Sequence, residues 1–112
     1  MTLLIADDND GIRNMLKSMT GEFFTEVFEC ANGKSACELS LEKKPDWILM
    51  DILMPGMDGL EATRKITRVN PDAKIIIVTN FDSDGLRRKA KEAGARSYIL
   101  KENTEGLINF FK

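Results

Sequence analysis

The chain has 112 residues, of which 43% are hydrophobic and 30% charged, as expected of one globular domain with a core of its own. Sixteen Lys and Arg residues against eighteen Asp and Glu residues give a net charge of −2, without the basic excess that duplex-binding domains usually carry. The sequence contains no His, which excludes His general bases, Ser-His-Asp triads and imidazole zinc sites. We therefore expect no direct binding of nucleic acid by this chain.

Five short apolar runs recur along the chain and are predicted strands, and an amphipathic segment follows each of them. Three of the runs are continuous rather than alternating, which is typical of strands buried on both faces of a sheet. The runs cover residues 3–6, 27–28, 47–50, 75–78 and 98–100.

The first two amphipathic segments are predicted helices with clear start and stop signals. From Ile12 onward, apolar residues recur at i, i+3, i+4 and i+7, with Asp10 as the expected N-cap and Gly21 as the end. The second helix is expected to begin after Asn32 and to end before Pro45.

Three further helices are predicted in the second half of the chain. One follows Asp58 and is closed by Asn70 and the proline after it. The next ends at Gly94, which is expected to adopt the C-terminal glycine cap. The last contains Leu107 and Phe111 and is expected to run to the chain end.

Five strand–helix units in succession define a fold. Right-handed crossovers between parallel strands place helices on both faces of one sheet. No repeat or low-complexity linker interrupts the pattern, so residues 1–112 are predicted to form a single α/β, doubly wound (βα)5 domain.

Polar residues stand where the predicted strands end. Asp7 and Asp8 follow the first strand, Asp51 the third, Thr79 the fourth and Lys101 the fifth. Ligands of such folds bind at the carboxyl ends of the strands. We therefore expect these five side chains to meet at one edge of the sheet.

Three acids at one edge indicate a cation site. Two carboxylates about 5 Å apart repel by roughly 3 kcal/mol at an effective dielectric constant of about 20. Oxygen ligands without Cys or His select a hard ion, and a few carboxylates with water suit Mg²⁺. The alternative is that Asp7, Asp8 and Asp10 only cap the first helix and interact favourably with its dipole.

Nothing in the sequence predicts export or membrane insertion. Residues 3–6 are too short for a signal peptide, and no window approaches the roughly 20 apolar residues of a membrane span. Cys30 and Cys37 lack the C-x-x-C spacing and are interpreted as small hydrophobes of a reducing compartment. The predicted location is therefore the cytoplasm, with no membrane contact.

From Asp7 to Lys101 and into the last predicted helix, the chain resembles the receiver domains of two-component response regulators. Its most specific part is residues 51–59, in which an acidic strand end is followed by the loop Met-Pro-Gly-Met-Asp-Gly. The resemblance implies a flavodoxin-like sheet with strand order 2-1-3-4-5.

The resemblance assigns a role to each residue of the acidic edge. Asp51 is the implied phosphoacceptor, which takes a phosphoryl group from a phosphohistidine. Lys101 and Thr79 would bind the phosphoryl oxygens. The implied Mg²⁺ ligands are Asp8, Asp51, the carbonyl of Leu53 and, through water, Asp7.

The resemblance also implies partners and a switch. The phosphodonor would be a sensor histidine kinase or a phosphotransfer protein. On phosphorylation Thr79 would move towards the phosphoryl group and Tyr98 would enter the vacated space. This would change the face formed by the fourth helix, fifth strand and fifth helix, which an output partner or an attached effector domain would recognise. The alternative is that Tyr98 is a half-buried strand residue with its hydroxyl in water.

Family precedent places two further residues beside the path of the hydrolytic water. They are Leu53 and Phe81, and both are bulky and apolar, which predicts slow dephosphorylation.

Two positions differ from the usual family pattern. Glu102 follows Lys101, where many family members have proline. Lys followed by an acidic residue is common in receivers attached to helix-turn-helix modules. Asn80 follows Thr79 where a small residue is usual.

Three functional readings follow, and the first is favoured. It is a phosphoaccepting receiver, which catalyses only its own phosphoryl transfer and slow dephosphorylation and is not otherwise an enzyme. A pseudo-receiver that binds partners without phosphorylation is the alternative, and the intact acidic edge argues against it. A phosphohydrolase with an aspartyl nucleophile lacks its D-x-D motif. The short last helix fits a receiver taken from a longer response regulator or a stand-alone one with a shortened end.

Overall fold

The computed structural model describes residues 1–112 and contains five parallel strands in one sheet, in the order β2-β1-β3-β4-β5. This confirms the doubly wound topology and the strand order. The strands are β1 Thr2–Ala6, β2 Glu26–Cys30, β3 Trp47–Met50, β4 Ile75–Thr79 and β5 Ser97–Leu100. The three central strands are buried on both faces, except at the start of β1, as their continuous apolar runs predict.

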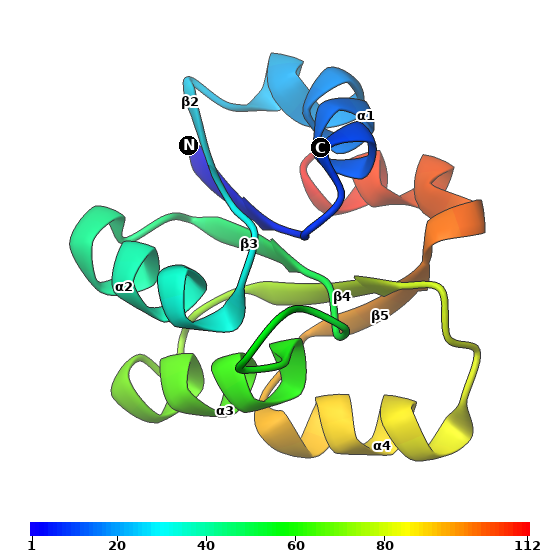
Figure 1. Cartoon of the computed structure of the whole chain (residues 1–112). Coiled ribbons are helices and arrows are strands. Elements are labelled where there is room, and N and C mark those ends of the chain that lie inside the picture. The colour runs from blue at the N-terminus through cyan, green and yellow to red at the C-terminus, as the bar shows by residue number, and fades with distance from the viewer.

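Helices cover both faces of the sheet (Figure 1). The helices are α1 Asp10–Thr20, α2 Gly33–Lys43, α3 Gly59–Val69 and α4 Asp84–Ala93, with 3₁₀ segments η1 Gly21–Phe23 and η2 Lys101–Phe110. Side chains of α2, α3 and α4 form one core with residues such as Leu4, Met50 and Ile77. Side chains of α1 and η2 form the other with Leu3 and Leu49. None of these helices has the length and apolar character needed to cross a membrane.

Most predicted helix ends are confirmed by capping contacts. The side chains of Asn32 and Asp58 accept hydrogen bonds from backbone N–H groups in the first turns of α2 and α3. Gly94 follows α4 with a φ of 104°, the left-handed conformation that glycine adopts most easily.

The predicted N-cap of α1 was wrong. Asn9, not Asp10, has the extended backbone of a cap, and its side-chain oxygen accepts from the Ile12 N–H at 2.9 Å. Asp10 is the first helical residue, where its charge favours the helix dipole and pairs with Arg13. At the other end, Gly21 follows α1 as expected but has right-handed helical angles, so the chain continues into η1.

The predicted last helix also differs. It begins at Lys101 rather than near Leu107 and consists of 3₁₀ turns, interrupted at Asn103 by non-helical backbone angles. No side chain caps its first turn. A short segment without a cap gains little from α-helical geometry, and packing of Leu107 and Phe111 on the sheet determines its course.

Candidate functional site

Backbone pairing extends one residue past the carboxyl ends of β1 and β3 and positions two acids there. The Asp7 N–H donates to the Cys30 carbonyl at 3.1 Å, and the Asp51 N–H donates to the Ala6 carbonyl at 2.9 Å. Asp7 and Asp51 are both buried, with exposed fractions of 1% and 5%. The central strands themselves therefore hold these two carboxylates beside each other.

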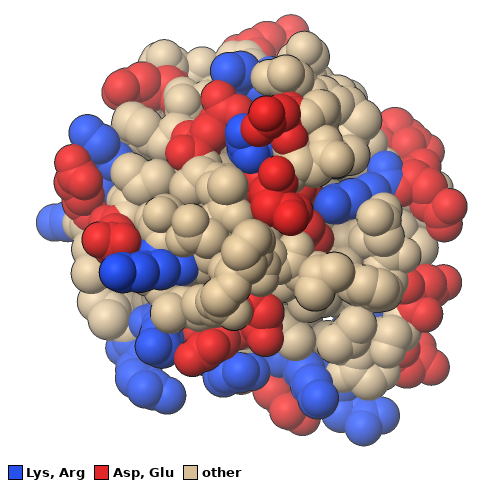
Figure 2. Space-filling view, viewed as in Figure 1, with Lys and Arg blue, Asp and Glu red and all other residues tan.

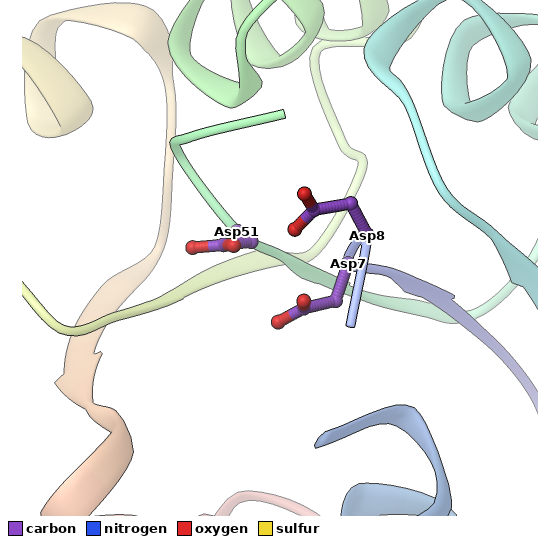
Figure 3. A group of neighbouring side chains, drawn as sticks. All are labelled: Asp7, Asp8 and Asp51. Carbon is purple, nitrogen blue, oxygen red and sulfur yellow. The ribbon is translucent and has the colours of Figure 1, made fainter. Parts of the chain in front are cut away.

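Asp8 completes an acidic cluster at this edge. One carboxylate oxygen from each of Asp7, Asp8 and Asp51 lies within 4.8 Å of the other two. Figure 3 shows the three carboxylates on the same side of the strand ends from which they project. Asp8 is exposed, so the cluster opens to solvent on its side.

Lys101, the first residue of η2, reaches this cluster from the end of β5. Its Nζ donates a hydrogen bond to Asp51 Oδ2 at 3.2 Å. It also forms an ion pair with Asp7 Oδ2 at 2.9 Å. This ion pair is the only polar contact of the buried Asp7 Oδ2, while Asp7 Oδ1 accepts from the Asn9 N–H. Lys101 is thus the only cation paired with the buried acids.

The electrostatics of this cluster favour protons and cations. Burial raises the pKa of Asp51 above its usual value, and the charge of Asp7 adds to this, against the opposing effects of Lys101 and the Ile52 N–H. Burial lowers the pKa of Lys101, but its contacts with Asp7 and Asp51 outweigh this and raise the pKa overall. Lys101 therefore stays charged at neutral pH.

A pH-dependent stability difference is expected for Asp51→Asn. Because folding raises the pKa of Asp51, its protonated form contributes stability that is fully present below the usual pKa of 3.8 and lost as the pH rises through the folded value. At pH 7 without metal, the uncharged Asn should therefore raise the melting temperature. The difference should shrink as the pH is lowered to about 4, measured by thermal denaturation in EDTA. A stability difference between the two proteins that does not change with pH would contradict this.

The loop after Asp51 is held close to the strand end by two glycines. The Gly59 N–H donates to the Ile52 carbonyl at 2.8 Å, and a Cβ at Gly59 would lie 1.8 Å from the Asp51 carbonyl oxygen. Gly56 has a φ of +71°, which favours glycine. The sequence motif indicated this turn, but the close approach of Gly59 to Asp51 is visible only in the structure.

Arg13 of α1 was not predicted to belong to this site. Its Nη1 donates to the Asp7 carbonyl at 2.6 Å, and its guanidinium also contacts Asp10 and Glu29. These contacts tie α1 and β2 to the loop that carries Asp7. A basic residue on the first turn after the acidic pair was the available signal.

Thr79 and Tyr98 are connected through the backbone of Phe81. The buried Thr79 Oγ1 accepts from the Phe81 N–H at 3.3 Å, and the Tyr98 hydroxyl donates to the Phe81 carbonyl at 2.5 Å. The guanidinium of Arg87 on α4 lies 4.6 Å from the centre of the Tyr98 ring. Tyr98 is a half-buried residue of β5, as the alternative expects, and its hydroxyl is bound to Phe81 at an exposed position.

The residues at the acidic edge fit a hard divalent cation. All available donors are oxygens, and the buried Asp7 Oδ2 contacts only the ammonium of Lys101. Three carboxylates face only the single ammonium of Lys101, which leaves negative charge for a cation to neutralise. The idea that Asp7 and Asp8 serve only as helix caps is not supported, because Asn9 caps α1.

A five-stranded parallel sheet of this order, with acids at its carboxyl edge, places the chain among the flavodoxin-like doubly wound domains, and comparison identifies the family. The chain matches the response regulator receiver domain family over residues 3–110 and belongs to it. It is 40% identical over 103 residues to response regulator GacA of Pseudomonas aeruginosa, covering 88% of this chain and 47% of GacA. It is 39% identical over 99 residues to chemotaxis protein CheY of Halobacterium salinarum, covering 88% of this chain and 82% of CheY.

Solved structures agree with this assignment. A receiver domain protein from Methanospirillum hungatei superposes with a TM-score of 0.89 at 28% identity, over 97% of this chain and 88% of that one. A LuxR-family DNA-binding response regulator from Staphylococcus aureus superposes with a TM-score of 0.87 at 32% identity, over 96% of this chain and 92% of that one. The chain spans about half the length of GacA and most of the length of CheY.

Proposed function

We propose that this chain accepts a phosphoryl group on Asp51 from a phosphohistidine of a sensor kinase or phosphotransfer protein in the cytoplasm. The observation that carries the proposal is the position of Asp51, with its carboxylate beside Asp7 and hydrogen-bonded to Lys101 at 3.2 Å. A carboxylate nucleophile needs neighbouring cationic groups that receive the phosphoryl oxygens.

Mg²⁺ is the proposed cofactor, and its protein ligands would be Asp8, Asp51 and the carbonyl of Leu53, with Asp7 acting through water. When bound, the ion neutralises charge on the phosphoryl oxygens and on the acids around it. The exposed position of Asp8 leaves room on that side for ligand water.

The protein's own residues position the reacting groups. A carboxylate oxygen of Asp51 forms the new bond to phosphorus while the bond from phosphorus to the donor's imidazole nitrogen breaks, and the imidazole leaves with that electron pair. Lys101 would turn from Asp51 and Asp7 to the phosphoryl oxygens, and Thr79 would donate its hydroxyl hydrogen to one of them. The chain would catalyse only its own phosphoryl transfer and slow dephosphorylation, so we do not propose that it is an enzyme acting on other substrates.

The contacts of Phe81 would transmit phosphorylation to the surface that an output partner recognises. Movement of the Thr79 hydroxyl towards a phosphoryl group would release the Phe81 N–H, and the Tyr98 hydroxyl is bound to the carbonyl of the same residue. The change would reach Arg87, which stacks on Tyr98. The face formed by α4, β5 and η2 is therefore the proposed contact for an output partner or an attached effector domain.

Incubation with acetyl phosphate and Mg²⁺ tests this function. We expect intact mass to show one phosphoryl group per chain, and hydroxylamine to remove it, because it is an acyl phosphate. No mass increase under conditions that phosphorylate another receiver would instead support a pseudo-receiver, which binds partners without phosphorylation.

Mg²⁺ should also stabilise the fold by mass action. The ion relieves repulsion of about 3 kcal/mol per carboxylate pair at 5 Å and an effective dielectric constant near 20. Asp8→Ala should remove most of the Mg²⁺-dependent rise in melting temperature and raise the metal-free value, whereas exposed Asp72→Ala should do neither. Identical melting curves of the natural chain with and without saturating Mg²⁺ would contradict a metal site.

A further inference from the structure

A second candidate site lies between α2 and α3, outside the acidic edge. The start of α2 lies against the loop before α3, where a Cβ at Gly33 would lie 2.4 Å from the Met57 carbonyl oxygen. Further along, α2 and α3 leave an open cavity between them with a volume of about 550 Å³. We call this cavity, lined chiefly by Cys37, Leu41, Lys44, Lys65, Ile66 and Val69, the α2–α3 groove.

The groove is apolar and unusually exposed. Leu41 and Val69 have exposed fractions of 60% and 65%, among the highest of the large hydrophobic side chains of the chain. Ile66 and Cys37 also line it, and burial raises the pKa of the Cys37 thiol, which therefore stays neutral. Apolar side chains gathered in one exposed concave surface indicate a binding site rather than scattered surface residues.

The charged side chains of the groove are all basic. Lys44 and Lys65 line it, and no acidic residue does. Lys44 forms no ion pair, and Lys65 forms only a long one of 3.8 Å with Glu61. Figure 2 shows uncharged surface on the left of the view, where α2 and α3 lie in Figure 1, bordered by both basic and acidic side chains.

The dimensions suit a short helix. The lining side chains on this side run from Cys37 of α2 to Lys44, the residue that follows the helix, and eight residues at 1.5 Å per residue span about 12 Å, or two helical turns. An amphipathic helix places apolar anchors at i, i+3, i+4 and i+7 over that length, with polar residues beside them. Acidic residues on its flanks would meet Lys44 and Lys65.

We propose that the α2–α3 groove binds an acidic amphipathic helix of a partner protein. Leu41 and Val69 provide apolar contact on either side of the helix, Ile66 contacts its buried face, and the two lysines select acidic flanks. The groove is separate from Asp51 and from the α4–β5–η2 face, so this binding does not depend on phosphorylation.

The test uses a defined probe and the full chain. The probe is a capped peptide of about 12 residues with Leu at i, i+3, i+4 and i+7 and Glu on the flanks, titrated against ¹⁵N-labelled unphosphorylated protein. We expect chemical-shift changes confined to the C-terminal halves of α2 and α3. A peptide with Lys in place of Glu, and one of the same composition without the helical spacing, should bind at least about tenfold more weakly.

Variants of exposed residues separate the apolar from the charged contribution to peptide binding. Leu41→Ser with Val69→Ser should weaken binding by about tenfold or more, as expected for loss of the apolar anchors. Lys44→Gln with Lys65→Gln should weaken it by about threefold or more and reduce its salt dependence. Lys34→Gln with Lys89→Gln removes the same charge elsewhere and should leave binding unchanged.

Four outcomes would overturn the proposal. One is equal binding of the Lys and Glu peptides, and another is a set of shift changes outside the groove. The third is sodium decanoate causing the same shifts at the same concentration while the peptide causes none, which would indicate a small amphiphile. The last is self-association of the chain that Leu41→Ser with Val69→Ser abolishes, which would indicate a second copy as the occupant.

Discussion

Replacement of Asp51 by Asn is expected to abolish phosphorylation of the chain by acetyl phosphate and Mg²⁺. The amide keeps the shape of the carboxylate but lacks the anionic oxygen that forms the bond to phosphorus. Loss of a nucleophile that no neighbour replaces should reduce the rate by at least about a hundredfold. The measurement is the intact mass of natural chain and variant after equal incubation.

The environment of Asp51 explains why its neighbours should not replace it. Asp7 is held by the Asn9 N–H at 2.9 Å and by Lys101, and Asp8 is exposed. Asp72→Asn, an exposed change of the same type, is the matched control and should be phosphorylated at the natural rate. A variant with Asn at position 51 that gained the same label at the same rate would show that another residue is the acceptor.

The meeting of the acidic residues at one edge was predictable because a parallel sheet brings all its strand ends to the same side. Asp51 and Lys101 are fifty positions apart and still form a hydrogen bond, since each follows a strand of the same sheet. The apolar runs determine the strands, and the strand ends then determine the neighbours. Their roles in phosphoryl transfer rest on the proposed function.

Features that depend on local backbone angles were harder to predict. Asn9 and Asp10 are adjacent and both favoured as caps, and only the extended backbone at Asn9 decides between them. The 3₁₀ geometry of η2 follows from tertiary packing of Leu107 and Phe111 rather than from helical propensity. The α2–α3 groove is lined by residues from two different helices, and no pattern within either helix predicts how the two pack together.

Slow self-dephosphorylation is expected once Asp51 carries a phosphoryl group. Hydrolysis requires a water in line with the bond between Asp51 and phosphorus, and family precedent places Leu53 and Phe81 beside that path. Both are exposed at the carboxyl edge, with fractions of 65% and 43%. Neither side chain has a polar atom that could orient a water molecule, and their bulk should exclude it.

In the unphosphorylated chain Phe81 is held at this edge through its backbone, since its N–H donates to Thr79 and its carbonyl accepts from the Tyr98 hydroxyl. Leu53 lies in the loop that Gly59 holds against Asp51. Substitution at these two exposed side chains should therefore alter water access without disturbing the buried acids.

Leu53→Asn with Phe81→Glu should speed loss of the phosphoryl group by about an order of magnitude or more, which corresponds to a barrier lower by at least about 1.4 kcal/mol. The polar replacements can accept a hydrogen bond from the attacking water and leave it more room. Decay of the phosphoprotein after donor removal, in Mg²⁺ buffer, gives the half-life.

Leu41→Asn with Val69→Glu makes matched changes in the α2–α3 groove and should leave that half-life unchanged. An unchanged half-life in the Leu53 and Phe81 variant would show that water access is controlled elsewhere, with the exposed Asn80 beside Thr79 as the next residue to test.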